Sequence, residues 1–174
     1  MMANNKADER AVPAFDHSVH SEVGGRLGEL VDEVLRLHGR VMSVKRPSVL
    51  GGPGQTFVLA SVVLAVEPPT VARIARSLGY TRQAIQRLAD VLAAEGYVSY
   101  EENPHHKTSK QLVATPLGRQ VYAQVNQESA EWTERISQGL DVAVLDQTLE
   151  VLRHVRRNLE QDKNAAAQGV TEQQ

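Results

Sequence analysis

Five side chains that can hydrogen-bond to nucleic acid stand close together in the middle of the chain: Thr81, Arg82, Gln83, Gln86 and Arg87. A guanidinium can donate two hydrogen bonds to guanine, a glutamine amide can pair with adenine, and a threonine hydroxyl reaches phosphate or base. Exposed arginines and glutamines taken alone are more often an ordinary solvated surface. Whether these residues read DNA therefore depends on the elements that position them.

Capping residues and glycines predict two short helices around this segment. Thr70 and Thr81 are expected N-caps, because a threonine hydroxyl accepts from the first free backbone amides. Gly79 and Gly96 suit the left-handed position that ends a helix. The predicted inward face of the second helix comprises Ala84, Ile85, Leu88, Val91 and Leu92. The arginines and glutamines lie off this face, so we expect them to project outward, as in the second helix of a helix-turn-helix unit.

A hairpin is expected directly after the second helix. Tyr97–Tyr100 and Gln111–Ala114 are rich in strand formers and flank a polar turn. Its candidate DNA contacts are His105, His106, Lys107 and Lys110. An unperturbed histidine titrates at about pH 6.5, so DNA affinity should rise as the pH falls if the turn reaches phosphate. A metal site at the histidine pair is disfavoured, because no cysteine or paired carboxylate lies nearby.

Longer helices are expected on both sides of this unit. Apolar residues recur three and four positions apart through residues 22–46 and again through 116–161, where Gly139 interrupts and Asp141 can cap the last helix. A short, almost wholly apolar helix is predicted over Gln55–Val66. The long stripes exceed what one small domain can cover, which favours a symmetric dimer. Residues 1–20 are expected to form a flexible arm and 162–174 a flexible tail.

Residues 70–98, followed by the hairpin and the run LVATPLGRQVY, resemble the MarR family of bacterial winged helix-turn-helix regulators. The positions that fit its pattern are Thr70, Ala72, Ala75, Leu78, Gly79, Arg82, Gln83, Ala84, Arg87, Leu88, Gly96, Thr115 and Gly118. The resemblance implies a DNA-binding domain over 55–115 and dimerisation through the helices of 22–46 and 116–161. It also implies a small-molecule effector bound between the dimer interface and the DNA-binding domains. The family's acidic residue and arginines at the wing tip are missing from Asn103–Thr108.

Composition limits the other classes of function. The chain has no cysteine, which excludes disulfides and thiolate metal sites. Its net charge is −2, yet residues 69–119 carry 7 Lys and Arg against 4 Asp and Glu, which suits a face turned toward an anionic polymer. No apolar run has the length of a membrane span and no secretion signal opens the chain, so a cytoplasmic protein is expected. No nucleophile with its base is visible, and Gly51–Gly54 lacks the lysine of a phosphate loop, so we expect no enzyme and no cofactor.

The sequence therefore predicts a mainly α protein with a small β-hairpin wing, built as a winged helix-turn-helix with N- and C-terminal dimerisation helices. The expected function is transcription regulation, with repression favoured, by a homodimer that binds pseudo-palindromic double-stranded DNA. An aromatic or amphipathic acid is the expected class of effector. The alternative is a winged-helix module that binds a protein and has no sequence-specific DNA contact.

Overall fold

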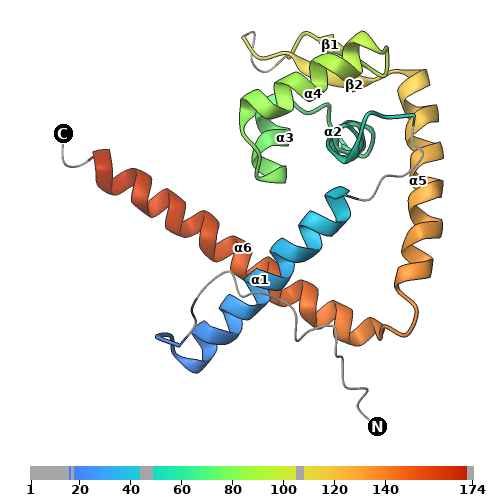
Figure 1. The fold of residues 1–174 in the computed structure, drawn as a ribbon. Helices are drawn as coiled ribbons and strands as arrows, with labels where there is room; N and C mark the ends of the chain where they lie inside the picture. Colours follow the sequence, from blue (N-terminus) through green and yellow to red (C-terminus); the bar gives the residue numbers. More distant parts are fainter. Residues whose placement is uncertain (1–15, 17, 44–48, 105–107, 172–174) are drawn as a thin grey trace. The chain divides into compact units, whose positions relative to one another are not determined.

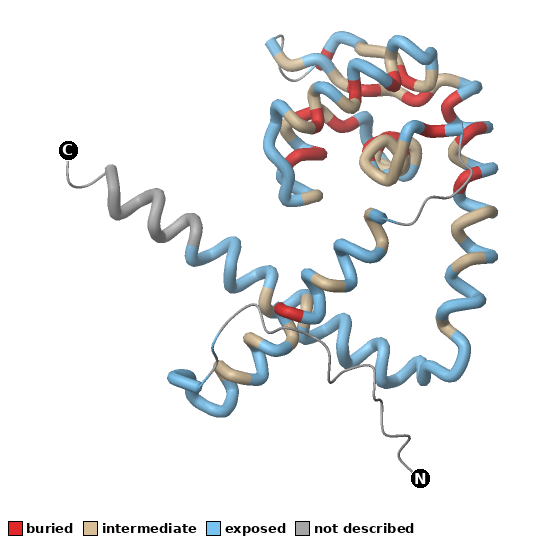
Figure 2. Tube along the Cα trace, viewed as in Figure 1, coloured by how far each residue is buried: buried red, intermediate tan, exposed pale blue. Residues whose placement is uncertain are grey.

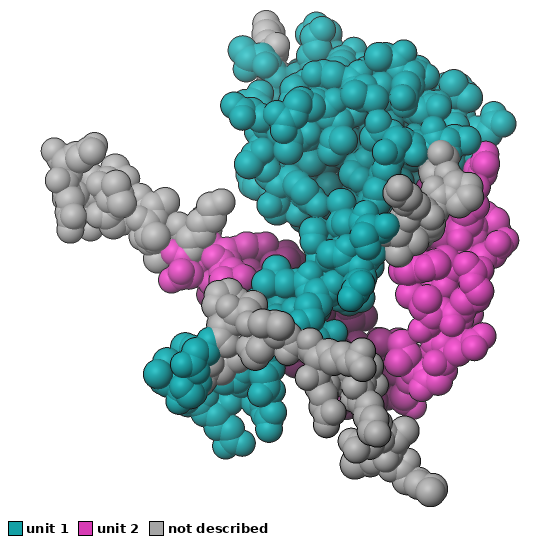
Figure 3. Space-filling model, in the orientation of Figure 1, with its two compact units in different colours: residues 1–122 teal, residues 123–174 magenta. Residues whose placement is uncertain are grey.

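The computed structural model describes residues 16, 18–43, 49–104 and 108–171, with side chains to residue 162. In this part the chain is mainly helical, with one two-stranded antiparallel sheet (Figure 1). Its elements are α1 (Glu22–Ser43), α2 (Pro53–Val63), α3 (Val71–Leu78), α4 (Arg82–Ala94), β1 (Val98–Glu101), β2 (Gln111–Ala114), α5 (Pro116–Ile136) and α6 (Val142–Thr171). The chain divides into two compact units, Met1–Tyr122 and Ala123–Gln174 (Figure 3). No helix of the described residues is long and apolar enough to span a bilayer.

The core of the first unit lies among α2, α3, α4 and the sheet, where the buried positions gather (Figure 2). Helix α4 contacts α2, α3 and β1, and α2 also contacts β2. The largest fully buried side chains are Val58, Leu59, Ile74, Ile85, Leu92 and Leu112. Each such burial is worth about 1.5–3 kcal/mol, so the central helix α4 is held by apolar contacts on its inner face.

The predicted helix boundaries around α3 and α4 are confirmed. The Thr70 hydroxyl accepts from the backbone amide of Arg73 at 3.2 Å, and the Thr81 hydroxyl accepts from Ala84 at 3.2 Å. Gly79 ends α3 with φ 72°, and Gly96 follows α4 with φ 76°. Residues that carry a side chain rarely adopt this left-handed backbone conformation, which explains why glycine occupies both positions.

The hairpin is anchored to the start of α3. Strands β1 and β2 pair from Val98 opposite Ala114 to Glu101 opposite Gln111. The backbone amide of Leu112 donates to the carbonyl of Pro69 at 2.8 Å, and an isolated bridge joins Thr70 to Gln111. Backbone hydrogen bonds therefore join the hairpin to the connection between α2 and α3.

Three sequence expectations need correction. Val91, predicted to face inward, is 40 % exposed, and Ala89 is buried in its place because Ile85, Ala89 and Leu92 form the true stripe. Helix α2 was predicted over Gln55–Val66, but it starts earlier, with Pro53 in its first turn, and ends earlier, at Val63, so that Val66 is exposed. Helix α6 continues to Thr171, well beyond Gln161, because the run DKNAAAQ contains good helix formers and no proline.

Helices α1 and α6 expose much apolar surface. On α1 the exposed side chains include Val23, Leu35 and Leu37, and on α6 they include Leu145, Leu149 and Leu159. The predicted cap of α6 is present: an oxygen of Asp141 accepts from the amides of Ala143 at 2.8 Å and Val144 at 3.1 Å. Both helices therefore show the apolar stripes expected from the sequence, and a single chain leaves these residues in contact with water.

Candidate nucleic-acid interface

The outer face of α4 carries most of the predicted base-reading residues. Thr81, Arg82, Gln83 and Arg87 are exposed, whereas Ile85 on the opposite side is buried. Within the described part of the chain, neither Arg82 nor Arg87 forms an ion pair with a carboxylate. The Thr81 oxygen accepts from Ala84, and its own proton stays available for a phosphate oxygen. The face thus offers unpaired positive charge and free donors.

A hollow of about 310 Å³ lies between this face and the hairpin. Arg82 and Gln86 of α4 line one side, and Ser109 and Lys110 of the hairpin line the other. A shallower hollow of about 350 Å³ is lined by Arg82, Gln83, Gln86 and Arg87. The fold therefore brings Lys110, which is far from α4 in sequence, to the same surface as Arg82, and it adds two hydroxyl-bearing neighbours, Thr108 and Ser109, that the sequence had not singled out.

Gln86 is half-buried, which differs from the outward projection expected for it. Its amide nitrogen Nε2 donates to Asp90 Oδ1 at 2.8 Å and to Tyr100 Oη at 2.7 Å. The Tyr100 hydroxyl donates to the same Asp90 oxygen at 2.7 Å. Asp90 was predictable as an i+4 partner of Gln86. Tyr100 was not, because it comes from β1.

Burial and the neighbouring carboxylate change the acidity of Tyr100. Burial raises the pKa of the phenol, and the hydrogen bond to Asp90 and the negative charge of Asp90 raise it further, to about 12. The hydrogen bond from Gln86 acts in the opposite direction. Tyr100 therefore keeps its proton at all physiological pH values, and this proton is directed to Asp90.

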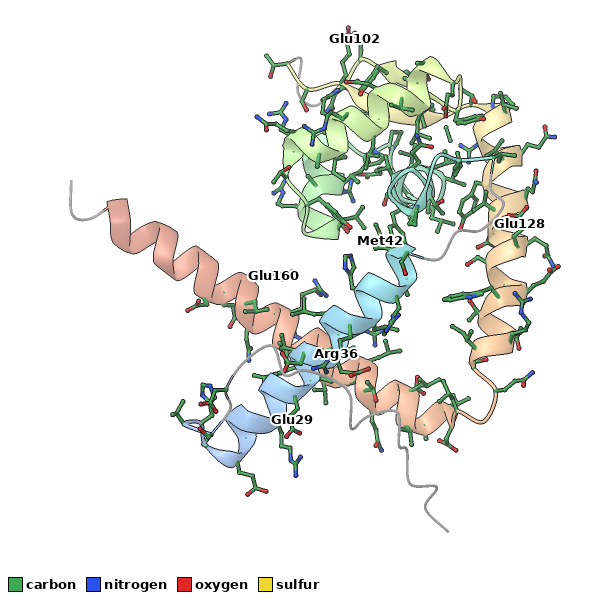
Figure 4. The ribbon with its side chains drawn as sticks, in the orientation of Figure 1. Glu29, Arg36, Met42, Glu102, Glu128 and Glu160 are labelled. Carbon is green, nitrogen blue, oxygen red and sulfur yellow. The ribbon has the colours of Figure 1, made fainter. Side chains whose placement is uncertain are left out.

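The hairpin tip is described only in part. His105, His106 and Lys107 lie outside the described residues, so their contact with DNA stays a prediction from sequence. Lys110 is exposed. Glu101 and Glu102 are exposed after the first half of the hairpin, and Glu102 points away from the body of the unit (Figure 4). Among the described residues no group of three or more histidine, aspartate or glutamate side chains could hold a metal.

A second, apolar groove of about 410 Å³ lies between α2 and α3. Phe57 and Leu64 of α2 and Leu78 of α3 are among its lining residues, and Val66 adds to it from the connection between the two helices. Among the described residues that line it, Arg73 alone is charged, and its guanidinium lies 3.7 Å from Glu67. This groove offers a surface for an apolar or aromatic group beside a cation.

Two helices joined by a turn at a left-handed glycine, followed by a hairpin packed on the second helix, define a winged helix-turn-helix protein. A model of the MarR family matches residues 53–107. An uncharacterised protein of Mycobacterium tuberculosis is 34 % identical over 122 residues, which cover 70 % of this chain and 82 % of that protein. The chain belongs to the MarR family.

Solved structures share the fold. A MarR/EmrR family transcriptional regulator from Acinetobacter sp. ADP1 superposes with a TM-score of 0.66 at 15 % identity, covering 82 % of this chain and 99 % of that one. BpsR of Bordetella bronchiseptica, whose DNA binding is regulated by 6-hydroxynicotinic acid, has a TM-score of 0.62 at 15 % identity, covering 75 % and 98 %. At these identities the likeness concerns the fold alone.

Proposed function

We propose that this protein is a transcriptional regulator, not an enzyme, and that a homodimer of it binds a pseudo-palindromic site on duplex DNA. The observation that carries the proposal is the outer face of α4, where Arg82, Gln83 and Arg87 are exposed and the arginines are unpaired within the described residues. A helix of this kind fits the major groove, where its first residues meet base edges.

The surroundings of α4 support the same role. Lys110 lies across the hollow from Arg82, so a DNA phosphate at the edge of the major groove would lie near two cations. Membership of a family of regulators agrees with this use of the surface. Repression is the favoured outcome of binding, because a dimer on DNA obstructs polymerase without needing a further contact surface.

The dimer is proposed from the apolar stripes of α1 and α6. Side chains such as Leu37 and Leu149 are 60 % and 44 % exposed in the single chain, and burying them against a second copy would be favourable. A two-fold axis would then present two copies of α4 to two half-sites one helical turn apart.

An aromatic or amphipathic acid is the proposed effector class. Support comes from the regulation of BpsR by 6-hydroxynicotinic acid and from the apolar groove with Arg73 at its edge. An effector that weakens DNA binding must itself bind more weakly, by the same factor, when DNA is present. Calorimetric titration of a panel of aromatic carboxylic acids with and without DNA tests this; equal affinities exclude a compound as an inducer.

The experiment for DNA binding is an electrophoretic shift with duplex DNA from upstream of the protein's own gene. The native protein should shift it, and the double variant Arg82→Ala/Arg87→Ala should not. Arg153→Ala is the matched control, because Arg153 is an exposed arginine of α6 that pairs with Glu150. No shift on that fragment and no enrichment from a randomised duplex library would leave the protein-binding module as the better interpretation.

A further inference from the structure

The cluster of Gln86, Asp90 and Tyr100 points to an unusual way of reading one base. We propose that Tyr100 and Asp90 orient Gln86 so that only its carbonyl oxygen Oε1 faces the DNA, which makes Gln86 select a base with an exocyclic amine, adenine or cytosine. This inference rests on the proposed function and adds to it a positioning residue, Tyr100, and the base class that Gln86 recognises.

The geometry leaves the amide nitrogen occupied. Gln86 Nε2 lies 2.8 Å from Asp90 Oδ1 and 2.7 Å from Tyr100 Oη, and it donates to both. One of these hydrogen bonds goes to a carboxylate, which makes it a charge-assisted bond. In the described part of the chain no hydrogen bond uses Oε1. Gln86 lines both hollows on the α4 face. With Nε2 used by Asp90 and Tyr100, Oε1 is the end of the amide left to this surface.

The chemistry of the partners determines which end of the amide faces inward. An ionised carboxylate only accepts, and the single proton of Tyr100 is donated to Asp90 at 2.7 Å. Toward Gln86, Asp90 Oδ1 and Tyr100 Oη can therefore only accept. A flipped amide would place Oε1 against these two oxygens with only the Tyr100 proton to share among the three, so at least one close pair of oxygens would repel.

An amide held in this way cannot make the usual bidentate contact with adenine. That contact requires Oε1 to accept from adenine N6 while Nε2 donates to N7. With Nε2 occupied, Oε1 can accept from adenine N6 or from cytosine N4, which are the amine donors of the major groove. Guanine and thymine present acceptors at the corresponding places, so they would face Oε1 with no proton to share.

Selection from a randomised duplex library tests the inference. The native protein should enrich sites with adenine or cytosine at one position of each half-site, and Gln86→Ala should erase the preference at that position alone. Tyr100→Phe removes an acceptor and frees an amide proton, so discrimination against guanine and thymine there should fall on the order of tenfold. Tyr97→Phe is the control, because Tyr97 is a half-buried tyrosine next to β1 outside the cluster.

A loss of structure would not reproduce this pattern, because it lowers affinity for all sequences. If Tyr100→Phe does not fold, as judged by thermal unfolding, Asp90→Asn gives the same test, because an asparagine amide can donate to Oε1 of Gln86 and so no longer fixes the orientation of the Gln86 amide. The inference is overturned if Tyr100→Phe keeps the native base profile. It is also overturned if the position that Gln86→Ala affects accepts both orientations of a base pair, or accepts adenine and guanine on one strand, or if Gln86→Ala affects no position. Failure of the native protein to enrich any sequence would instead overturn the proposed function itself, and the inference with it.

Discussion

Gly118, in the first turn of α5, lies directly against the backbone carbonyl of Tyr97. A Cβ atom on Gly118 would overlap the Tyr97 carbonyl oxygen and lie 2.8 Å from its carbonyl carbon. The same carbonyl accepts from the backbone amide of Thr115 at 3.1 Å and from its hydroxyl at 3.2 Å. The start of α5 is thus clamped to the residue before β1, and only glycine permits so close an approach.

Gly118→Ala should therefore destabilise the protein, although alanine favours a helix over glycine. Displacing backbone to relieve such an overlap costs about 1–3 kcal/mol or more. The same substitution at Gly39 in α1 should be neutral or stabilise by up to about 1 kcal/mol, because a Cβ atom there would meet no described residue within 4 Å apart from its chain neighbours and the helix's own backbone. Chemical denaturation of both variants measures the difference; equal stabilities would contradict the clamp.

Arg82→Ala and Lys110→Ala should weaken DNA binding in different ways. Loss of Arg82 should cost about 1–3 kcal/mol and relax preference at one position of each half-site, because a base contact carries sequence information. Loss of Lys110 should weaken all sequences alike and reduce the salt slope by about 1, because a phosphate contact releases counterions. Affinities for matched and mismatched duplexes at several salt concentrations separate the two. A uniform loss for both variants would show that Arg82 does not read a base.

Tyr100 should release its proton near pH 12, whereas an unperturbed tyrosine does so near pH 10. Because the folded state holds this proton more tightly than the unfolded state, the contribution of Tyr100 to stability is complete below pH 10 and is lost as the pH rises from 10 to 12. Phenolate absorbance should show a last titration step that Tyr100→Phe removes. A titration of Tyr100→Phe that retains this step would assign it to another tyrosine.

Leu149→Glu should convert the proposed dimer to a monomer. Leu149 is 44 % exposed on α6, and burying an unpaired carboxylate in an apolar interface is costly. Gln147→Glu is the matched control, because Gln147 is an exposed polar residue two positions away on the same helix. Ser61→Glu is not a suitable control, because Ser61 lies on the half-buried helix α2. Sedimentation velocity should report a dimer for the native protein and for Gln147→Glu. A native monomer at micromolar concentration would exclude the dimer.

Local chemistry was enough to predict the elements that hold the candidate site. The caps at Thr70, Thr81 and Asp141 and the left-handed Gly79 depend on a residue and its next few neighbours, so the chain alone reveals them. Periodicity likewise predicted the buried face of α3 and most of that of α4. The prediction was wrong at Val91, because periodicity does not separate an apolar residue on the buried face of a helix from an apolar residue next to that face.

Contacts between distant segments needed the folded chain. Gln86 looks like an ordinary exposed reader in the sequence, and only the pairing of β1 with β2 and the packing of β1 on α4 bring Tyr100 to its amide. The clamp of Gly118 on Tyr97 depends in the same way on where α5 begins relative to the sheet. Side-chain types and short-range spacing determine helices, turns and the residues offered to a ligand. The orientation of those residues depends on partners from other elements, which tertiary packing alone brings within hydrogen-bonding distance.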